Sequence, residues 1–74
     1  MTIRALELFC GIGGFAAAVA GRNVRIVGAL DQSREALTVY RLNFPAHHAV
    51  QTDLERMSAE ELASYHADFW WLSP

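Results

Sequence analysis

The 74-residue chain lacks several features that would narrow its function directly. It has one cysteine, Cys10, so it can form neither an internal disulfide framework nor a cysteine-based zinc site. A reducing, cytoplasmic location is the corresponding expectation. The formal charge is -2, and no basic run of the kind that neutralises phosphates stands out. If a nucleic acid is the partner, its binding groove is therefore expected elsewhere.

Long apolar runs are also missing. The stretch Phe9 to Gly21 carries no charge, but its thirteen residues fall short of the roughly 20 that a membrane-spanning helix needs. Its A-x-A-like end is weak evidence for a signal peptide, since Glu7 interrupts the apolar approach and Arg4 is the only charge ahead of it. With 53% hydrophobic residues and few glycines and prolines, the composition predicts a folded interior.

The first half of the chain alternates strand and helix patterns. IRALEL, at Ile3–Leu8, alternates apolar and polar residues and predicts a strand that ends at a glycine cluster. The alanine-rich segment Phe15–Ala20 predicts a helix that Gly21 closes. VRIVGAL, at Val24–Leu30, is a β-branched apolar run and predicts a second strand, covered on both faces.

The same alternation continues in the second half. Ser33 is a suitable N-cap for a helix whose apolar spacing ends at Pro45, and His47–Thr52 is a weak third strand. Ser58 and Glu61 have the spacing of a capping box, which opens a third helix that runs to about residue 65.

DFWWLS then predicts a fourth strand, in which Trp70 and Trp71 point to opposite faces and are expected in the core. The fold class is therefore α/β, with a mostly parallel sheet that makes about half of a doubly wound, Rossmann-like fold. Half a sheet would leave apolar surface uncovered near the two tryptophans, so self-association is also expected.

Candidate binding residues follow three of the predicted strands. Gly11, Gly13 and Gly14 form a turn between strand and helix, where backbone can approach an anionic or electron-rich ligand. Asp31 follows the second strand and is placed to accept from two ribose hydroxyls, or else to stabilise a helix N-terminus. Asp53 follows the third strand and is either an acceptor for an adenine amino group or an ordinary loop acid.

Four segments resemble motifs of the cytosine-5 methyltransferases, which act on DNA or, in one branch, on tRNA. ALELFCGIGGF is similar to their first motif, ALDQSREALTVYRLNFP to the second, TDL to the third, and DFWWLSP to the run into the fourth. The resemblance covers Ile3 to Pro74. It implies the N-terminal half of a Rossmann-like, S-adenosylmethionine-dependent methyltransferase fold, with DNA as the expected substrate and tRNA as the alternative.

The resemblance also implies roles for individual residues. Asp31 would hold the ribose of the cofactor. In two respects the chain departs from the common motifs: Gln32 stands where many members have tryptophan, and Thr52 where glycine is common. The cofactor-binding residues implied by the family are Phe9 against the adenine or the sulfonium, Gly11, Ile12, Gly13 and Gly14 at the methionine part, Asp31, Asp53 with Leu54 at the adenine, and Ser73 near the cofactor.

The family uses a cysteine that the 74 residues are not expected to supply. Its thiolate adds to carbon 6 of a flipped cytosine, so that carbon 5 can attack the sulfonium methyl group. In the family this cysteine lies in a Pro-Cys-Gln motif just beyond the position of Pro74. The expectation is thus a partial cofactor-binding domain, 1–74, without a catalytic residue and inactive alone. Cys10, inside the turn, is expected to be a small buried filler.

Other interpretations stay open on the residues alone. Gly11, Gly13, Ala16 and Asp31 also satisfy a loose dinucleotide fingerprint, which would make the chain an NAD- or FAD-binding domain. A remnant without catalytic activity is a third possibility. No metal site is expected, because the three histidines, His47, His48 and His66, have no acid or cysteine at ligand spacing. These histidines are expected to face solvent. A scattered set of arginines is expected to face solvent as well: Arg22, Arg25, Arg34, Arg41 and Arg56.

Overall fold

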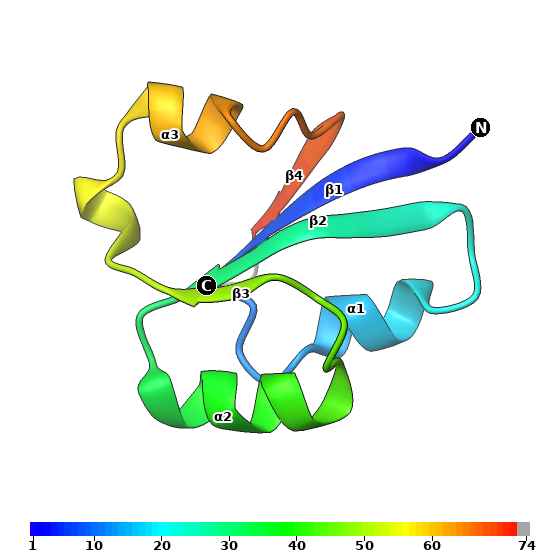
Figure 1. The fold of residues 1–74 in the computed structure, drawn as a ribbon, viewed down its shortest axis with the longest axis horizontal. Helices are drawn as coiled ribbons and strands as arrows, with labels where there is room; N and C mark the ends of the chain where they lie inside the picture. The colour runs from blue at the N-terminus through cyan, green and yellow to red at the C-terminus, as the bar shows by residue number, and fades with distance from the viewer. Residues whose placement is uncertain (73–74) are drawn as a thin grey trace.

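The computed structural model, which describes residues 1–72, contains one four-stranded sheet in the order β3-β2-β1-β4 (Figure 1). Every neighbouring pair of strands is parallel, so the carboxyl ends of all the strands meet at one edge. This confirms the α/β class and the mostly parallel sheet predicted from the sequence. The strands are β1 (Ile3–Leu8), β2 (Val24–Asp31), β3 (Ala49–Gln51) and β4 (Phe69–Leu72).

The helices lie on both faces of the sheet. α1 (Gly14–Val19) and α2 (Arg34–Asn43) cover one face, and α3 (Ala59–Ala63) covers the other (Figure 1). A short 3-10 helix, η1 (Leu54–Arg56), precedes α3 and was not predicted from the sequence. Within the described range, no helix is long and apolar enough to cross a bilayer.

Two of the helix starts confirm the sequence predictions at the level of single hydrogen bonds. The Ser33 hydroxyl accepts the backbone N–H of Ala36 at 3.1 Å and so caps α2. At α3, Ser58 and Glu61 form a reciprocal capping box, in which each side chain accepts the other's backbone N–H. Such caps satisfy N–H groups that have no partner inside the helix, which fixes where each helix begins.

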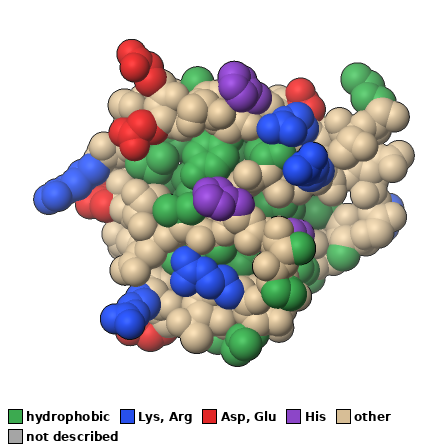
Figure 2. All heavy atoms as spheres, in the orientation of Figure 1, with side chains coloured by type: hydrophobic (Ala, Val, Ile, Leu, Met, Phe, Trp, Pro, Cys, Tyr) green, Lys and Arg blue, Asp and Glu red, His purple; other side chains and the backbone are tan. Residues whose placement is uncertain are grey.

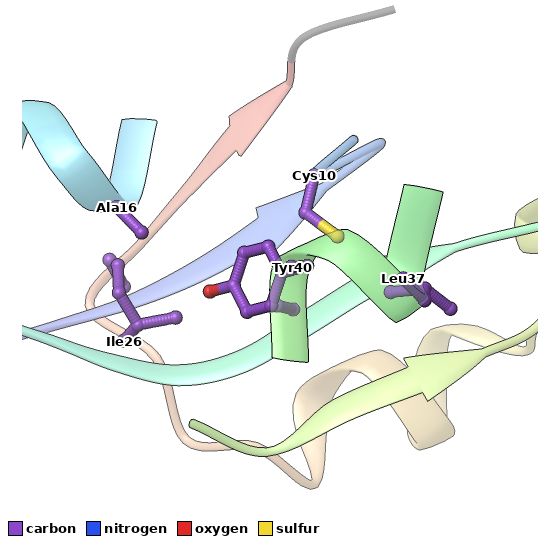
Figure 3. Close-up of a cluster of buried hydrophobic side chains, with 7 residues drawn as sticks. Cys10, Ala16, Ile26, Leu37 and Tyr40 are labelled. Carbon is purple, nitrogen blue, oxygen red and sulfur yellow. The ribbon is translucent and has the colours of Figure 1, made fainter. Parts of the chain in front are cut away.

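Two hydrophobic clusters hold the layers together. The larger lies between the sheet and the α1–α2 layer; Figure 3 shows Tyr40 and Leu37 of α2 together with Cys10, Ala16 and Ile26. Tyr40 and Leu37 are completely buried. The smaller cluster faces α3 and is built on Leu6, Leu8 and Leu30. Burial on both faces explains why the central strands β1 and β2 have almost no exposed positions toward their carboxyl ends.

The prediction that Trp70 and Trp71 are core residues is wrong. Their relative exposures are 46% and 44%, because β4 is an edge strand and the elements around it cover only part of each ring. The Trp71 ring stacks on Phe15 of α1, with centroids 4.7 Å apart. Leu72 is exposed as well. The expected uncovered apolar surface at this edge is therefore confirmed.

Candidate functional site

The candidate site lies at the edge of the sheet where the parallel strands end. Three connections meet there: the glycine turn after β1, residues 9–13, the start of α2 after Asp31, and the loop after β3 that holds Thr52 and Asp53. Backbone hydrogen bonds fix their spacing. The Cys10 N–H donates to the Leu30 carbonyl oxygen at 3.1 Å, and the Thr52 N–H donates to that of Asp31 at 2.9 Å. The three strand ends singled out in the sequence are thus neighbours in space.

The glycine turn has a backbone that most residues avoid. Gly13 has a φ of 103°, and a Cβ atom placed there would lie 2.5 Å from the Phe44 ring and 3.1 Å from that of Tyr40. The end of α2 therefore packs directly beneath the turn. The Asn43 side chain also reaches the turn and donates to the Ile12 carbonyl oxygen at 3.5 Å. This contact explains why the Tyr-x-x-Asn-Phe pattern accompanies the glycines in the sequence.

Phe9 precedes this turn in a conformation that is rare for a bulky residue. Its φ is 59°, in the left-handed region that favours glycine, so its backbone is strained. The side chain lines a small cavity of about 60 Å³. Of the predicted binding residues, Phe9, Asp53 and Leu54 meet at this cavity, whose full lining is Phe9, Gln32, Thr52, Asp53, Leu54 and Glu55.

The Asp31 side chain links the glycine turn after β1 to the start of α2. Its Oδ2 accepts the Gly11 N–H and its Oδ1 accepts the Ser33 N–H, both at 2.8 Å. Each carboxylate oxygen can accept a further hydrogen bond, because a carboxylate has about four lone-pair sites. The two interpretations weighed for Asp31 are compatible in this geometry: the side chain binds the amide that precedes α2 and still has acceptor capacity toward a ligand.

Asp53 has mainly local partners. Its Oδ1 accepts the Glu55 N–H at 3.1 Å, which caps η1, and its Oδ2 lies 3.6 Å from Nε of Arg56. Both members of this ion pair are well exposed, so the pair contributes little stability. The loop-acid role is therefore present in the structure. At the same time, Asp53 lines the cavity beside Phe9, where its remaining lone pairs can accept from a ligand.

Most of the remaining predicted binding residues lie on the other side of the glycine turn. Ile12, Gly13 and Gly14 line a hollow of about 230 Å³ on the α1 side of the turn, and Ile12 is 60% exposed. Gly11 contributes its N–H to Asp31 instead. Ser73 lies outside the described residues.

Glu7 was not recognised from the sequence as anything but the polar position of an alternating strand. It is 1% exposed, and the N–H of Ala16, in the first turn of α1, donates to its carboxyl group. Among residues 1–72, its Oε2 has no hydrogen-bond partner. Burial raises the pKa of Glu7 to about 7, and the Ala16 N–H opposes only part of that rise. Its burial could have been inferred from the sequence, because Glu7 is an acid close to the glycine turn in a strand that was predicted to have helices on both faces.

Cys10 is the buried filler that was predicted. It is 5% exposed, and burial together with the nearby carboxylates of Glu7 and Asp31 raises the pKa of its thiol to about 12. Since the thiolate is the nucleophilic form, Cys10 is unsuited to attack a cytosine.

Cys10 should accordingly resist chemical modification. In native protein at pH 8, iodoacetamide should label it at least about tenfold more slowly than in urea-unfolded protein, because both exposure and the thiolate fraction are low. Mass spectrometry of timed samples gives both rates. Equal rates in the two states would contradict the buried, protonated thiol.

The histidines only partly follow the prediction. His48 and His66 are exposed, as expected, but His47 is half-buried. The Nδ1 of His47 lies 3.0 Å from the Tyr40 hydroxyl, its ring stacks on Phe44 at 5.0 Å, and burial lowers its pKa. Within residues 1–72, no group of three histidine, cysteine or acidic side chains could hold a metal ion.

Known proteins with the same sequence pattern and fold are cytosine-5 methyltransferases. The family model described as C-5 cytosine-specific DNA methylase matches residues 3–74. The tRNA (cytosine(38)-C(5))-methyltransferase of Rattus norvegicus is 36% identical in an alignment of 74 positions, which covers 97% of this chain and 19% of the rat enzyme. The protein of the same name from Spodoptera frugiperda is 30% identical over 100% of this chain and 23% of its own length.

The solved structures agree with the sequence matches. The crystal structure of S. pombe Dnmt2 methyltransferase superposes with a TM-score of 0.88 at 32% identity, over 97% of this chain and 23% of that one. The chain thus spans about a fifth of the length of its relatives.

Proposed function

The chain belongs to the C-5 cytosine-specific DNA methylase family, and from this membership we propose that it forms the S-adenosylmethionine-binding part of a cytosine-5 methyltransferase that acts on tRNA. The observation that carries the cofactor proposal is the arrangement around Asp31. This carboxylate is tied to the glycine turn through Gly11 at 2.8 Å and keeps free acceptor sites at the edge where ligands of doubly wound sheets bind.

The choice of tRNA over DNA is supported by the relatives and not by the site. The sequence analysis favoured DNA and kept tRNA as the alternative. Two relatives that align with nearly the whole chain, from a mammal and an insect, are named tRNA (cytosine(38)-C(5))-methyltransferases. These names support the alternative better than the first choice. A cytosine in tRNA is therefore the substrate that we propose for the whole protein.

The described residues would hold different parts of the cofactor. Asp31 would accept from the ribose hydroxyls, and the glycine turn would face the methionine part with backbone groups alone. Phe9, Asp53 and Leu54, which line one cavity, would hold the adenine, with Gln32 at its rim. Bound S-adenosylmethionine supplies a methyl group on a sulfonium centre. The chain's contribution is to bind and orient this group; Cys10, as a buried and protonated thiol, contributes packing.

A binding experiment with a conservative variant tests this proposal. Isothermal calorimetry should detect S-adenosylmethionine binding to the chain, and Asp31→Asn should weaken it about tenfold or more, because a hydrogen bond to a charged acceptor contributes about 1.5–3 kcal/mol. NAD, the ligand of the rival dinucleotide interpretation, should not bind. The variant also changes the acceptor for Gly11, so circular dichroism must first show that it is folded.

Glu35→Gln is the matched control, because it removes one exposed carboxylate in the first turn of α2. The affinity of Glu35→Gln for S-adenosylmethionine should equal that of the parent chain. Tighter binding of NAD than of S-adenosylmethionine, or equal affinities of Asp31→Asn and the parent chain, would refute the proposal.

A further inference from the structure

Two arginines lie side by side at the opposite edge of the sheet, where β1 and β2 begin. Arg4 and Arg25 are partners in the parallel register of these strands. Each is adjacent in its strand to a residue of the larger core cluster, Ala5 or Ile26, so both side chains project toward the α3 face. Like charges directly across a strand pair are unfavourable. The pair therefore requires a compensating group.

The protein supplies this compensation for only one of the two. The guanidinium of Arg4 donates from Nε to the His66 carbonyl oxygen at 2.9 Å and from Nη2 to that of Tyr65 at 3.0 Å. Arg25 is exposed, and its side chain has no hydrogen bond or ion pair within residues 1–72. One cation thus remains without a counter-ion beside another.

A groove of about 470 Å³ adjoins the pair, and we call it the arginine groove. Its lining is Arg4, Val24, Arg25, Ile26, Val27, Ala46, His47 and His48. Figure 2 shows two Lys or Arg side chains next to each other on this face, with an Asp or Glu side chain beside them. Asp68 contacts Arg4, since its Oδ2 accepts the backbone N–H of Arg4 at 2.8 Å, but Asp68 does not line the groove. The lining therefore combines two cations and two imidazoles with no carboxylate.

The composition of the groove points to phosphate. All six basic residues of the chain are arginines, and the planar guanidinium binds phosphate oxygens through two parallel hydrogen bonds. We propose that the arginine groove binds the phosphate backbone of the RNA substrate, with Arg25 as the main contact. That the polyanion is RNA rests on the function proposed above.

The position of the groove favours a long polyanion. β2 has eight residues, so the two edges of the sheet are about 25 Å apart. A small phosphate compound in the groove could not reach the cofactor edge, whereas a folded RNA can contact both. The expectation that Arg25 faces solvent is confirmed. The register of β1 and β2 additionally places Arg25 beside Arg4, which the sequence analysis did not predict.

Charge reversal at Arg25 tests the proposal. Fluorescence anisotropy of a labelled tRNA transcript, titrated with the purified chain in 50 mM salt, should show about tenfold weaker binding for Arg25→Glu. The slope of log affinity against log salt should also fall by about 1. Arg34→Glu makes the same charge change at an exposed site on α2 and should stay within about threefold of the parent chain.

Two further measurements separate the possible failures. Arg25→Gln should melt no lower than the parent chain, because it relieves the repulsion with Arg4, so loss of RNA binding in this variant cannot come from unfolding. S-adenosylmethionine affinity should be the same in Arg25→Glu and the parent chain. If the cofactor does not bind at all, the proposed function is wrong. The comparison of RNA affinities would still show whether the arginine groove binds RNA.

Three results would contradict the proposal that the arginine groove binds RNA. The first is that the chain does not bind tRNA, and the second is that Arg25→Glu and Arg34→Glu lose the same amount of tRNA affinity. The third is that polyglutamate at equal charge concentration displaces the RNA, and that polyglutamate binding depends on Arg25 to the same extent. The last result would mean that the groove docks an acidic protein segment. Displacement by inorganic phosphate at matched ionic strength would mean a free-anion site.

Discussion

Gly13→Ala is expected to destabilise the chain by about 3 kcal/mol, the largest effect of any single methyl group in the glycine turn. Two costs combine at this position. A φ of 103° is strained for a residue with a Cβ, and the new methyl group would lie 2.5 Å from the Phe44 ring. The ring cannot move freely, because it stacks on His47 and contacts Tyr40, which is fully buried. The substitution must therefore displace the turn or the end of α2.

The neighbouring glycines provide graded controls for this prediction. Gly11 has a φ of 54° but open space around its Cβ position, so Gly11→Ala should cost only the strain of about 1–2 kcal/mol. Gly14 begins α1 with open space and no positive φ, so Gly14→Ala should be neutral or stabilise by up to about 1 kcal/mol.

Urea unfolding followed by circular dichroism gives the three free energies. The expected order of stability is Gly14→Ala above Gly11→Ala above Gly13→Ala. If Gly13→Ala were as stable as Gly14→Ala, the close packing of α2 against the turn would be refuted. Because Gly14 lines the hollow on the α1 side, its alanine variant also shows whether the turn contacts the cofactor: a stable variant with weaker S-adenosylmethionine binding indicates direct contact.

The elements of this fold could be predicted from local patterns because each has a local cause. Ser33 caps α2, and Ser58 with Glu61 caps α3, through hydrogen bonds over three residues. The parallel pairing of the strands follows from the helices that connect them, whereas the strand order was not predicted from the sequence. η1 was missed because Asp53 was interpreted as an adenine acceptor or a loop acid, and not as the cap of a short helix.

Burial was harder to predict, because it depends on which elements lie next to each other. Trp70 and Trp71 have the pattern of a covered strand, but β4 is at the edge of the described sheet. Arg4 and Arg25 are twenty-one positions apart in the sequence, and only the register of β1 and β2 brings them together. Side chains whose surroundings depend on a neighbouring strand are thus the ones whose burial and contacts the sequence could not predict.

Glu7 is the clearest case, and it gives the second large prediction. Between pH 4.5 and 7, the wild-type chain should lose about 3 kcal/mol of stability that a Glu7→Gln variant keeps. Burial raises the pKa of this carboxyl to about 7, so the folded state holds its proton more tightly than the unfolded state, whose pKa is about 4.5. The contribution to stability is complete below pH 4.5 and is lost as the pH rises to about 7.

His47 acts in the opposite direction and has to be separated from Glu7. Burial lowers its pKa, so the folded chain holds this proton less tightly, and the contribution of His47 to stability rises with pH through the range below its ordinary value of about 6.5. His47 is present in both the parent chain and Glu7→Gln. The difference between their unfolding free energies at each pH therefore isolates Glu7.

Glutamine keeps an acceptor for the Ala16 N–H and puts a neutral amide group in place of the ionisable oxygen Oε2, which has no hydrogen-bond partner among the residues that the structure describes. The variant should therefore be more stable than the parent chain above pH 7, and the advantage should shrink toward pH 4.5. Since domains of this size have a total stability of roughly 5–10 kcal/mol, the difference should be clear in urea unfolding at pH 5 and pH 8. Glu35→Gln, which removes an exposed acid, should show no such change between the two values. A constant difference between the parent chain and Glu7→Gln across this range would mean that Glu7 does not titrate in the folded state, and the carboxylate would then have to be ionised and paired inside the core.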